Sequence, residues 1–259
     1  MKSLITKLIS GILSLTFASI ISPTSTFALT NIEASSDYFS HTLFAGDSIM
    51  VGFKNALKET DSPIKEASFY CIGGYGVRTA IRPIELGDIH PLYDNQIVNL
   101  WTAAQDKNIE RLYLMFGLND IGVTGVETAC SNYVSLIDNV LETRPDMEII
   151  VLSTTSMLPG IEYPNLTNEN IAQLNMTMKD ICDEHDWTFL DVASSLNDQN
   201  GNLLPEYCSD GALHLNNSAY INKLFPLISH NKIWSEESIE KLDEEPPKSK
   251  HKEMTVLIL

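Results

Sequence analysis

Basic residues are scarce in this sequence. Its 259 residues include 17 lysines and arginines against 34 aspartates and glutamates, which gives a formal net charge of −17 at pH 7. An acidic surface repels phosphate backbones and anionic lipids, so this imbalance argues against nucleic-acid partners and against docking on a membrane surface. It favours a protein that stays soluble outside the cell.

Cysteine is scarce as well, and none of the four lies in a CxxC pair; they are Cys71, Cys130, Cys182 and Cys208. Zinc and redox sites are therefore not indicated, and we expect no metal and no cofactor. Outside the cell, four cysteines permit two disulfides in any of three pairings. A chain with 44% hydrophobic residues can fill a sizeable core without such cross-links. Disulfides therefore stay open at this point.

Long hydrophobic runs are absent except near residue 1. Two lysines flank the start of an uncharged apolar run from Leu8 to Ile21, and the small residues Thr26 and Ala28 stand three and one positions before a cut. This pattern predicts a cleaved secretory signal peptide over residues 1–28, hence a secreted, extracellular protein with no stable membrane insertion after cleavage. The alternative, an amino-terminal membrane anchor, is less favoured because a span needs about 20 apolar residues.

Five short apolar runs, each bounded by polar or turn residues, predict strands at residues 41–46, 67–73, 111–117, 147–154 and 187–192. Strands that alternate with helices imply right-handed crossovers and a mostly parallel sheet covered on both faces. We therefore predict a three-layer α/β domain over residues 29–233. Residues 234–259 are rich in charge and proline and predict a flexible tail, although the closing MTVLIL could instead be a buried strand.

Two of the intervals between these runs have helical periodicity. In the first, Thr124 and Glu127 have the spacing of a capping box. Apolar residues then recur every three or four positions until Pro145: Val126, Cys130, Val134, Ile137 and Leu141. The second interval keeps the same period with Ile171, Leu174, Met178 and Ile181. Met176 and Met178 are thus better read as helix residues than as a metal-binding pair.

In a parallel sheet, function gathers at the carboxyl ends of the strands, where Ser48, Gly74 and Asn119 all fall. Ser48, in the stretch FAGDSIMVG, lies where a helix should begin. A serine hydroxyl is a poor nucleophile unless a base takes its proton and donors stabilise the oxyanion that forms. The backbone N–H of Ser48 is one such donor, because the first N–H groups of a helix are unpaired.

Two further oxyanion donors can be named. The loop CIGGYGVRTA contains Gly74, where a substrate could approach the backbone closely, with Gly76 as the alternative. The segment LYLMFGLND leads an apolar run into Asn119, whose amide can donate a hydrogen bond without carrying charge. Taken alone, Asn119 is more simply a helix cap or a turn former.

The base is expected near the end of the domain. In YCSDGALHLNNSAY, Asp210 and His214 precede a candidate final helix, and an acid, a turn and an imidazole in this order would orient one ring nitrogen and free the other. The remaining histidines have no comparable setting and are read as surface residues: His41, His90, His185, His230 and His251.

Taken in order, GDS, a glycine in the second loop, GLND and the Asp-Gly-to-His segment resemble the SGNH hydrolase family, also called GDSL esterases and lipases, over roughly residues 40–230. The resemblance implies a flavodoxin-like fold with five parallel strands. It implies Ser48 as nucleophile, His214 as base and Asp210 as the acid that orients it. The backbone of Ser48, Gly74 and the Asn119 side chain would form the oxyanion hole.

One position departs from the family pattern. The family places the acid three residues before the histidine, where this sequence has Gly211, whereas Asp210 stands four residues before His214. Either the turn carries one extra residue, or a backbone carbonyl orients the ring in place of Asp210.

The function expected is that of a secreted serine esterase, with acyl groups on a carbohydrate or cell-wall polymer as the favoured substrates. A small-molecule or polysaccharide ester is then its partner. A lipid esterase, a thioesterase, or a carbohydrate-binding module that has lost turnover remain alternatives on the same fold.

Overall fold

The computed structural model of the protein describes residues 36–58, 60–161 and 163–229. The predicted signal peptide at residues 1–28 and the predicted tail at residues 234–259 lie outside these ranges.

A five-stranded parallel sheet forms the centre of the described chain. Its strands are β1 (Thr42–Gly46), β2 (Ser68–Cys71), β5 (Arg111–Met115), β6 (Glu148–Leu152) and β7 (Thr188–Leu190), in the order β2-β1-β5-β6-β7. The predicted three-layer α/β fold with five parallel strands is therefore confirmed. Every predicted strand is present, but the predicted bounds exceed the observed ones by one to three residues, mostly at the carboxyl end, since the chain leaves the sheet before the apolar residues end.

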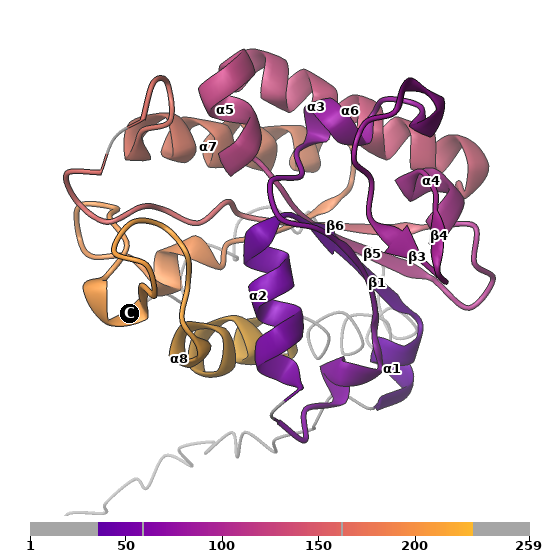
Figure 1. Cartoon of the computed structure of the whole chain (residues 1–259), viewed down its shortest axis with the longest axis horizontal. Coiled ribbons are helices and arrows are strands. Elements are labelled where there is room, and N and C mark those ends of the chain that lie inside the picture. Colours follow the sequence, from indigo (N-terminus) through magenta and orange to yellow (C-terminus); the bar gives the residue numbers. More distant parts are fainter. Residues whose placement is uncertain (1–35, 59, 162, 230–259) are drawn as a thin grey trace, which may run out of the picture. The chain divides into compact units, whose positions relative to one another are not determined.

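Helices cover both faces of this sheet. Figure 1 shows α2 and α8 on one face, and α3, α5, α6 and α7 on the other. The helices of the described chain are α1 (Ser36–Ser40), α2 (Ser48–Leu57), α3 (Val77–Ala80), α4 (Leu100–Ala103), α5 (Leu118–Thr124), α6 (Val126–Thr143), α7 (Asn168–Glu184) and α8 (Asn217–Ala219). Short 3-10 segments occur at Pro63–Glu66, Ile84–Leu86, Ala193–Ser195 and Pro205–Tyr207, and α8 continues into a π-helical turn at Tyr220–Leu224.

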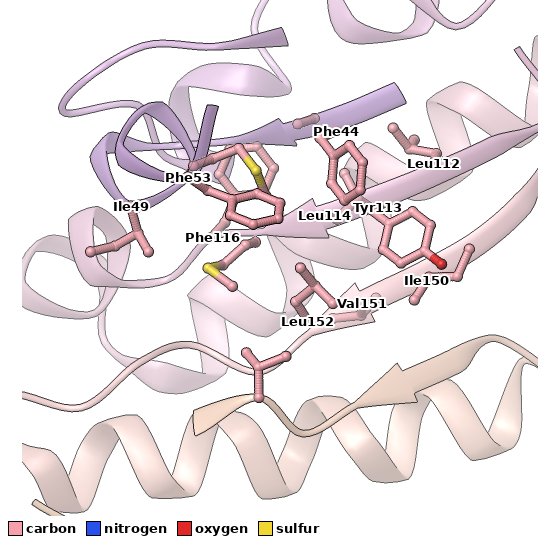
Figure 2. Close-up of a cluster of buried hydrophobic side chains, with 14 of the residues drawn as sticks. Phe44, Ile49, Phe53, Leu112, Tyr113, Leu114, Phe116, Ile150, Val151 and Leu152 are labelled. Carbon is pink, nitrogen blue, oxygen red and sulfur yellow. The ribbon is translucent and has the colours of Figure 1, made fainter. Parts of the chain in front are cut away.

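Aromatic and aliphatic side chains from β1, β5, β6 and α2 make up a central cluster of the core (Figure 2). Every residue of β1 is buried, because helices cover the sheet on both sides. Phe44 of β1 packs against Tyr113 of β5, with ring centroids 4.8 Å apart, and against Phe53 of α2, at 5.8 Å. These contacts fix α2, and with it Ser48 at its first turn, against the middle of the sheet.

A small hairpin escaped the sequence analysis. Strands β3 (Leu92–Tyr93) and β4 (Gln96–Ile97) pair antiparallel across a turn in which Asp94 and Asn95 have φ values of 48° and 61°. Two positive φ values are typical of the tight turns that match the twist of a hairpin, and aspartate and asparagine tolerate them. The paired Leu92 and Ile97 are 62% and 56% exposed, so no alternation of buried and exposed residues marked these strands.

The predicted capping box is wrong. Thr124 is the last residue of α5, and its hydroxyl donates to the carbonyl oxygen of Asp120. Gly125, with a φ of 75°, separates α5 from α6 and itself occupies the N-cap position of α6. Thr124 cannot cap the following helix because it already belongs to the preceding one. The two predicted helices themselves are present as α6 and α7.

All four cysteines are free thiols. Cys130 and Cys182 are buried, whereas Cys71 and Cys208 are half-buried. The possible disulfides of the sequence analysis are thus not formed, and the core holds without them. Within the described ranges, no helix combines the length and the apolar character that a membrane crossing requires.

Arg144, at the C-terminus of α6, holds the segment that leads into β5. Its guanidinium donates to the carbonyl oxygens of Ala104 at 3.0 Å, Asp106 at 3.2 Å and Ile109 at 2.8 Å, and it forms an ion pair with Asp146. The side chain is largely buried, so removing it would leave the carbonyl oxygens of the buried Ala104 and Ile109 without this donor.

We predict that Arg144→Ala lowers the free energy of unfolding by about 2–3 kcal/mol, because several charge-assisted hydrogen bonds are lost together. Urea denaturation followed by circular dichroism measures this. Arg144→Lys is the matched control. Lysine keeps the charge but lacks the planar group that reaches three carbonyl oxygens, so its free energy of unfolding should lie between those of the wild type and Arg144→Ala. A wild-type midpoint for Arg144→Ala would contradict this role.

Candidate active site

Ser48 lies at the point where the strand order reverses. It follows β1, which is flanked in the sheet by β2 and β5, and it is the first residue of α2. Open α/β sheets bind their ligands in the crevice at such a reversal. The preceding residue, Asp47, is the N-cap of α2 and accepts a hydrogen bond from the N–H of Ile49 at 2.9 Å. This cap fixes the start of the helix and therefore the position of the Ser48 hydroxyl.

His214 reaches Ser48 from a distant part of the chain. Its Nε2 lies 3.0 Å from Ser48 Oγ, and its Nδ1 lies 2.5 Å from Asp210 Oδ2. Because a carboxylate can only accept, Nδ1 carries the proton and Nε2 is free to accept from the serine hydroxyl. The three predicted residues are thus in hydrogen-bond contact, in the order acid, imidazole, hydroxyl.

The extra residue between the acid and the histidine is absorbed in the turn. Gly211 has a φ of 74°, a value that glycine adopts without a Cβ penalty. The loop then curls around the carboxylate, whose Oδ1 accepts from the N–H groups of Ala212, Leu213 and His214 at 2.8, 3.0 and 3.2 Å. Asp210 rather than a backbone carbonyl therefore faces the ring.

The same contacts set the charge of Asp210. Partial burial raises the pKa of its carboxyl group, but the hydrogen bonds from the His214 ring and from three backbone N–H groups lower it by more. The net effect is a pKa below the usual range, so Asp210 stays ionised at neutral pH. An ionised acid at this place stabilises a protonated imidazole.

At the site, the backbone N–H groups of Ser48 and Gly74 have no hydrogen bond to another described residue. Gly74 has a φ of 74°, and a Cβ there would meet nothing within 4 Å, so this loop is open on the side of Gly74. Gly76, the alternative donor of the sequence analysis, has a different place. It is the N-cap of α3, and the Asp120 carboxylate lies where a Cβ of Gly76 would be, so the loop is closed on that side of Gly76.

Asn119 joins the loops that carry these groups. Its Nδ2 donates to Asp47 Oδ2 at 3.0 Å and to the carbonyl oxygen of Tyr75 at 3.2 Å. Asp47 precedes Ser48 and Tyr75 follows Gly74, so one amide links the ends of β1, β2 and β5. The side chain caps no helix, since Gly117 holds the N-cap position of α5. The simpler interpretation of Asn119 as a helix cap is therefore wrong.

Two buried acids were missed by the sequence analysis. Asp47 is 2% exposed, and burial raises the pKa of its carboxyl group to about 7, with the charge of Asp120 adding to the shift. Asp120 is fully buried and accepts from the N–H groups of Val77 and Arg78 at 3.1 and 3.0 Å, which anchors α3 to α5. Both acids lie within the quoted motifs GDS and GLND. A helix-start position was a usable signal for Asp47, whereas none predicted the long-range contact of Asp120.

One histidine was also misplaced. His90 is 4% exposed, and its Nδ1 lies 2.9 Å from the hydroxyl of Tyr75, so it is not a surface residue. Burial lowers the pKa of the His90 imidazole, which favours its neutral form. His41 contacts the carbonyl oxygen of Asn108, and His185 stacks on Trp187. His230 and His251 lie outside the described ranges.

In the part of the chain that the structure describes, no group of His, Cys, Asp and Glu side chains is arranged to hold a metal ion.

Residues 44–220 match the model of the GDSL-like lipase/acylhydrolase family. The chain belongs to this family. The match spans most of the described residues and includes all of those assembled above. Membership makes the chain an ester hydrolase of the lipase and acylhydrolase type. Among curated proteins, no sequence matches it.

Several solved structures resemble the fold of this chain. A protein from Streptococcus pneumonia is 26% identical with a TM-score of 0.56, over 77% of this chain and 88% of that one. A GDSL-like lipase from Bacteroides thetaiotaomicron is 14% identical with a TM-score of 0.56, over 77% and 90%. A carbohydrate esterase of family 3 from Talaromyces cellulolyticus is 11% identical with a TM-score of 0.55, over 76% and 98%.

The close approach of Asp120 to Gly76 gives a prediction about stability. A Cβ at Gly76 would lie 2.5 Å from Asp120 Oδ1, so Gly76→Ala must displace a buried carboxylate from the N–H groups that it accepts. We expect a loss of about 2–4 kcal/mol in the free energy of unfolding.

Gly74→Ala is the matched comparison in the same loop. It has room for a Cβ and suffers only from its positive φ, which costs about 1 kcal/mol. Chemical denaturation of both variants measures the difference. Equal losses in the free energy of unfolding of the two variants would show that the contact with Asp120 does not require a glycine at position 76.

Proposed function

We propose that the protein is a secreted serine esterase in which Ser48, His214 and Asp210 form the catalytic triad. The observation that carries the proposal is the 3.0 Å contact between Ser48 Oγ and His214 Nε2, with the Asp210 carboxylate 2.5 Å from the other ring nitrogen. A serine so placed has a base to take its proton, and the base has an acid that fixes its tautomer. A binding module has no need of this arrangement.

The reaction then follows in two stages. Ser48 Oγ attacks the ester carbonyl carbon while its proton passes to His214 Nε2, and the tetrahedral oxyanion collapses with loss of the alcohol, which takes that proton. Water next attacks the acyl-serine, again giving its proton to His214, and the carboxylic acid leaves as Ser48 recovers its hydrogen. Asp210 stabilises the imidazolium in both stages and remains ionised.

The oxyanion is assigned three donors. The N–H groups of Ser48 and Gly74 are unengaged by the described residues, and the positive end of α2 favours a negative charge beside Ser48. The Nδ2 of Asn119 is the third donor. Its hydrogen bonds to Asp47 and to the Tyr75 carbonyl oxygen hold the Asn119 amide beside the loops that carry Ser48 and Gly74.

For the substrate we propose short acyl groups on a carbohydrate or cell-wall polymer. The acidic composition and the predicted signal peptide support a working place outside the cell, where such polymers occur. A structural relative is a carbohydrate esterase, and this likeness is compatible with the proposal without carrying it. A lipid esterase or a thioesterase with the same triad is the second candidate, favoured by the family description.

The proposed nucleophile has a direct test. A fluorophosphonate should add one phosphonyl group to the protein and abolish hydrolysis of p-nitrophenyl acetate, because it traps an activated serine. Intact-mass analysis and peptide mapping locate the adduct, which we expect on Ser48. Ser48→Ala should form none, whereas Ser135→Ala, a change at an exposed serine of α6, should react as the wild type does.

Folded protein that neither reacts nor hydrolyses any ester would refute the enzyme and favour the binding module. A panel of p-nitrophenyl esters of rising chain length separates the substrate classes. Activity that falls steeply beyond acetate and butyrate supports a deacylase of short groups, whereas activity that rises with chain length supports a lipid esterase.

The acid of the triad gives a further prediction. Asp210→Asn should lower kcat by about 10⁴, because an amide can hold the imidazole in the wrong tautomer, and His214→Ala should be at least as severe. Steady-state kinetics on p-nitrophenyl acetate measures both. A nearly silent Asp210→Asn beside an inactive His214→Ala would instead indicate a Ser-His dyad. The wild-type circular dichroism spectrum serves as the control for folding.

A further inference from the structure

The carboxylate of Asp47 is buried and both of its oxygens are engaged. Oδ1 accepts from the N–H of Ile49 at 2.9 Å, and Oδ2 accepts from Nδ2 of Asn119 at 3.0 Å. No cation forms an ion pair with Asp47 among the described residues, and the residue is 2% exposed. The fold therefore keeps an acid in a place where the charged form is poorly solvated.

Capping α2 does not by itself account for an acid at this position. Serine, threonine and asparagine cap a helix about as well as aspartate, and none of them brings a charge into the interior. The cap uses only Oδ1. The second carboxylate oxygen, Oδ2, accepts the hydrogen bond from Asn119. A serine in place of Asp47 could cap α2 but could not make this bond.

The amide of Asn119 has two hydrogens, and both have acceptors in this structure: Asp47 Oδ2 at 3.0 Å and the Tyr75 carbonyl oxygen at 3.2 Å. An oxyanion can receive a hydrogen bond from Asn119 only by competing with one of these acceptors. Above its pKa of about 7 Asp47 is a carboxylate, and a hydrogen bond to a carboxylate is stronger than one to a neutral carbonyl. The bond to Asp47 is therefore the one that persists, and the bond to Tyr75 is the one that gives way.

We propose that Asp47 is a positioning residue of the oxyanion hole: it holds the Asn119 amide by one hydrogen while the other passes from the Tyr75 carbonyl to the oxyanion. This role rests on the proposed function. The Tyr75 carbonyl is then a resting-state acceptor that keeps the donor oriented until a substrate arrives. It is suited to this because the Tyr75 ring is anchored by its hydroxyl, which lies 2.9 Å from His90 Nδ1 and 3.3 Å from the Tyr70 hydroxyl.

Kinetics of Asp47→Ser tests the role. Serine restores the helix cap but not the bond to Asn119, so we expect kcat to fall at least about tenfold, while KM stays within about twofold. Asn119→Ala alone should cost about 10² to 10³ in kcat, as loss of an oxyanion donor does. In the Asn119→Ala background, Asp47→Ser should change kcat by less than about twofold, because the group through which Asp47 acts is already gone.

Thr167→Ala is the matched control for a lost cap. Thr167 caps α7 through the N–H of Asn170, away from the site, and its removal should lower stability without lowering kcat of the folded protein. Equal losses of kcat from Asp47→Ser in the wild-type and the Asn119→Ala backgrounds would overturn the role, and so would an unchanged kcat. Wild-type protein that hydrolyses no ester and forms no phosphonate adduct refutes the proposed function itself, and this role with it.

The bond can also be observed without turnover. The side-chain NH₂ signals of Asn119 in a ¹H–¹⁵N spectrum are identified by their absence in Asn119→Ala. Asp47→Ser should move one of the two protons upfield, since it loses a charged acceptor, and the phosphonate adduct on Ser48 should move the other. Signals unchanged in Asp47→Ser would show that Asp47 does not hold the amide, whatever the kinetics.

Discussion

The Asn119 amide ties together the ends of three neighbouring strands. Its two hydrogen bonds, to Asp47 after β1 and to Tyr75 after β2, start from a residue that follows β5. The parallel order β2-β1-β5 brings these ends to one edge of the sheet, but it leaves the loops free to diverge beyond it. The amide constrains all three loops at the level of the reacting serine, and the Asp120 carboxylate adds a second link between the segments after β2 and β5.

Much of the fold could be predicted from the sequence because its signals are local. Each strand of the parallel sheet is a short apolar run, and α6 and α7 keep a helical period over several turns. The hairpin β3–β4 has only two residues in each strand and exposes its apolar pair, so no period could mark it. The capping-box pattern at Thr124 failed for a related reason. The pattern is local, but Gly125 with its positive φ decided which helix Thr124 joins.

The reacting residues of the site could be predicted from the sequence, but the residues that support them could not. Ser48, Asn119, Asp210 and His214 could be found because the order of their motifs resembles a known family, and the loop geometry then accommodates the extra residue at Gly211. The supporting groups could not. Asp120 binds the first turn of α3 across more than 40 positions, and His90 is buried against Tyr75, 15 positions away. Burial of a polar residue is a property of the assembled chain, and a polar residue in the sequence indicates the opposite.

The loop from Asp210 to His214 has a mechanical consequence. The carboxylate accepts from three N–H groups of its own loop, and the ring it orients belongs to the same loop, so acid and base form a single rigid unit. The backbone hydrogen bond from the N–H of Ser209 to the carbonyl oxygen of His214 closes this loop, and the one from the N–H of Leu158 to the carbonyl oxygen of Ala212 joins it to the rest of the domain. A displacement of the whole loop would therefore leave the acid–base pair intact and alter the contact between His214 Nε2 and Ser48 Oγ. The catalytic machinery is therefore built as two preassembled halves, and a ligand that wedges between them would disconnect the nucleophile without disturbing either half.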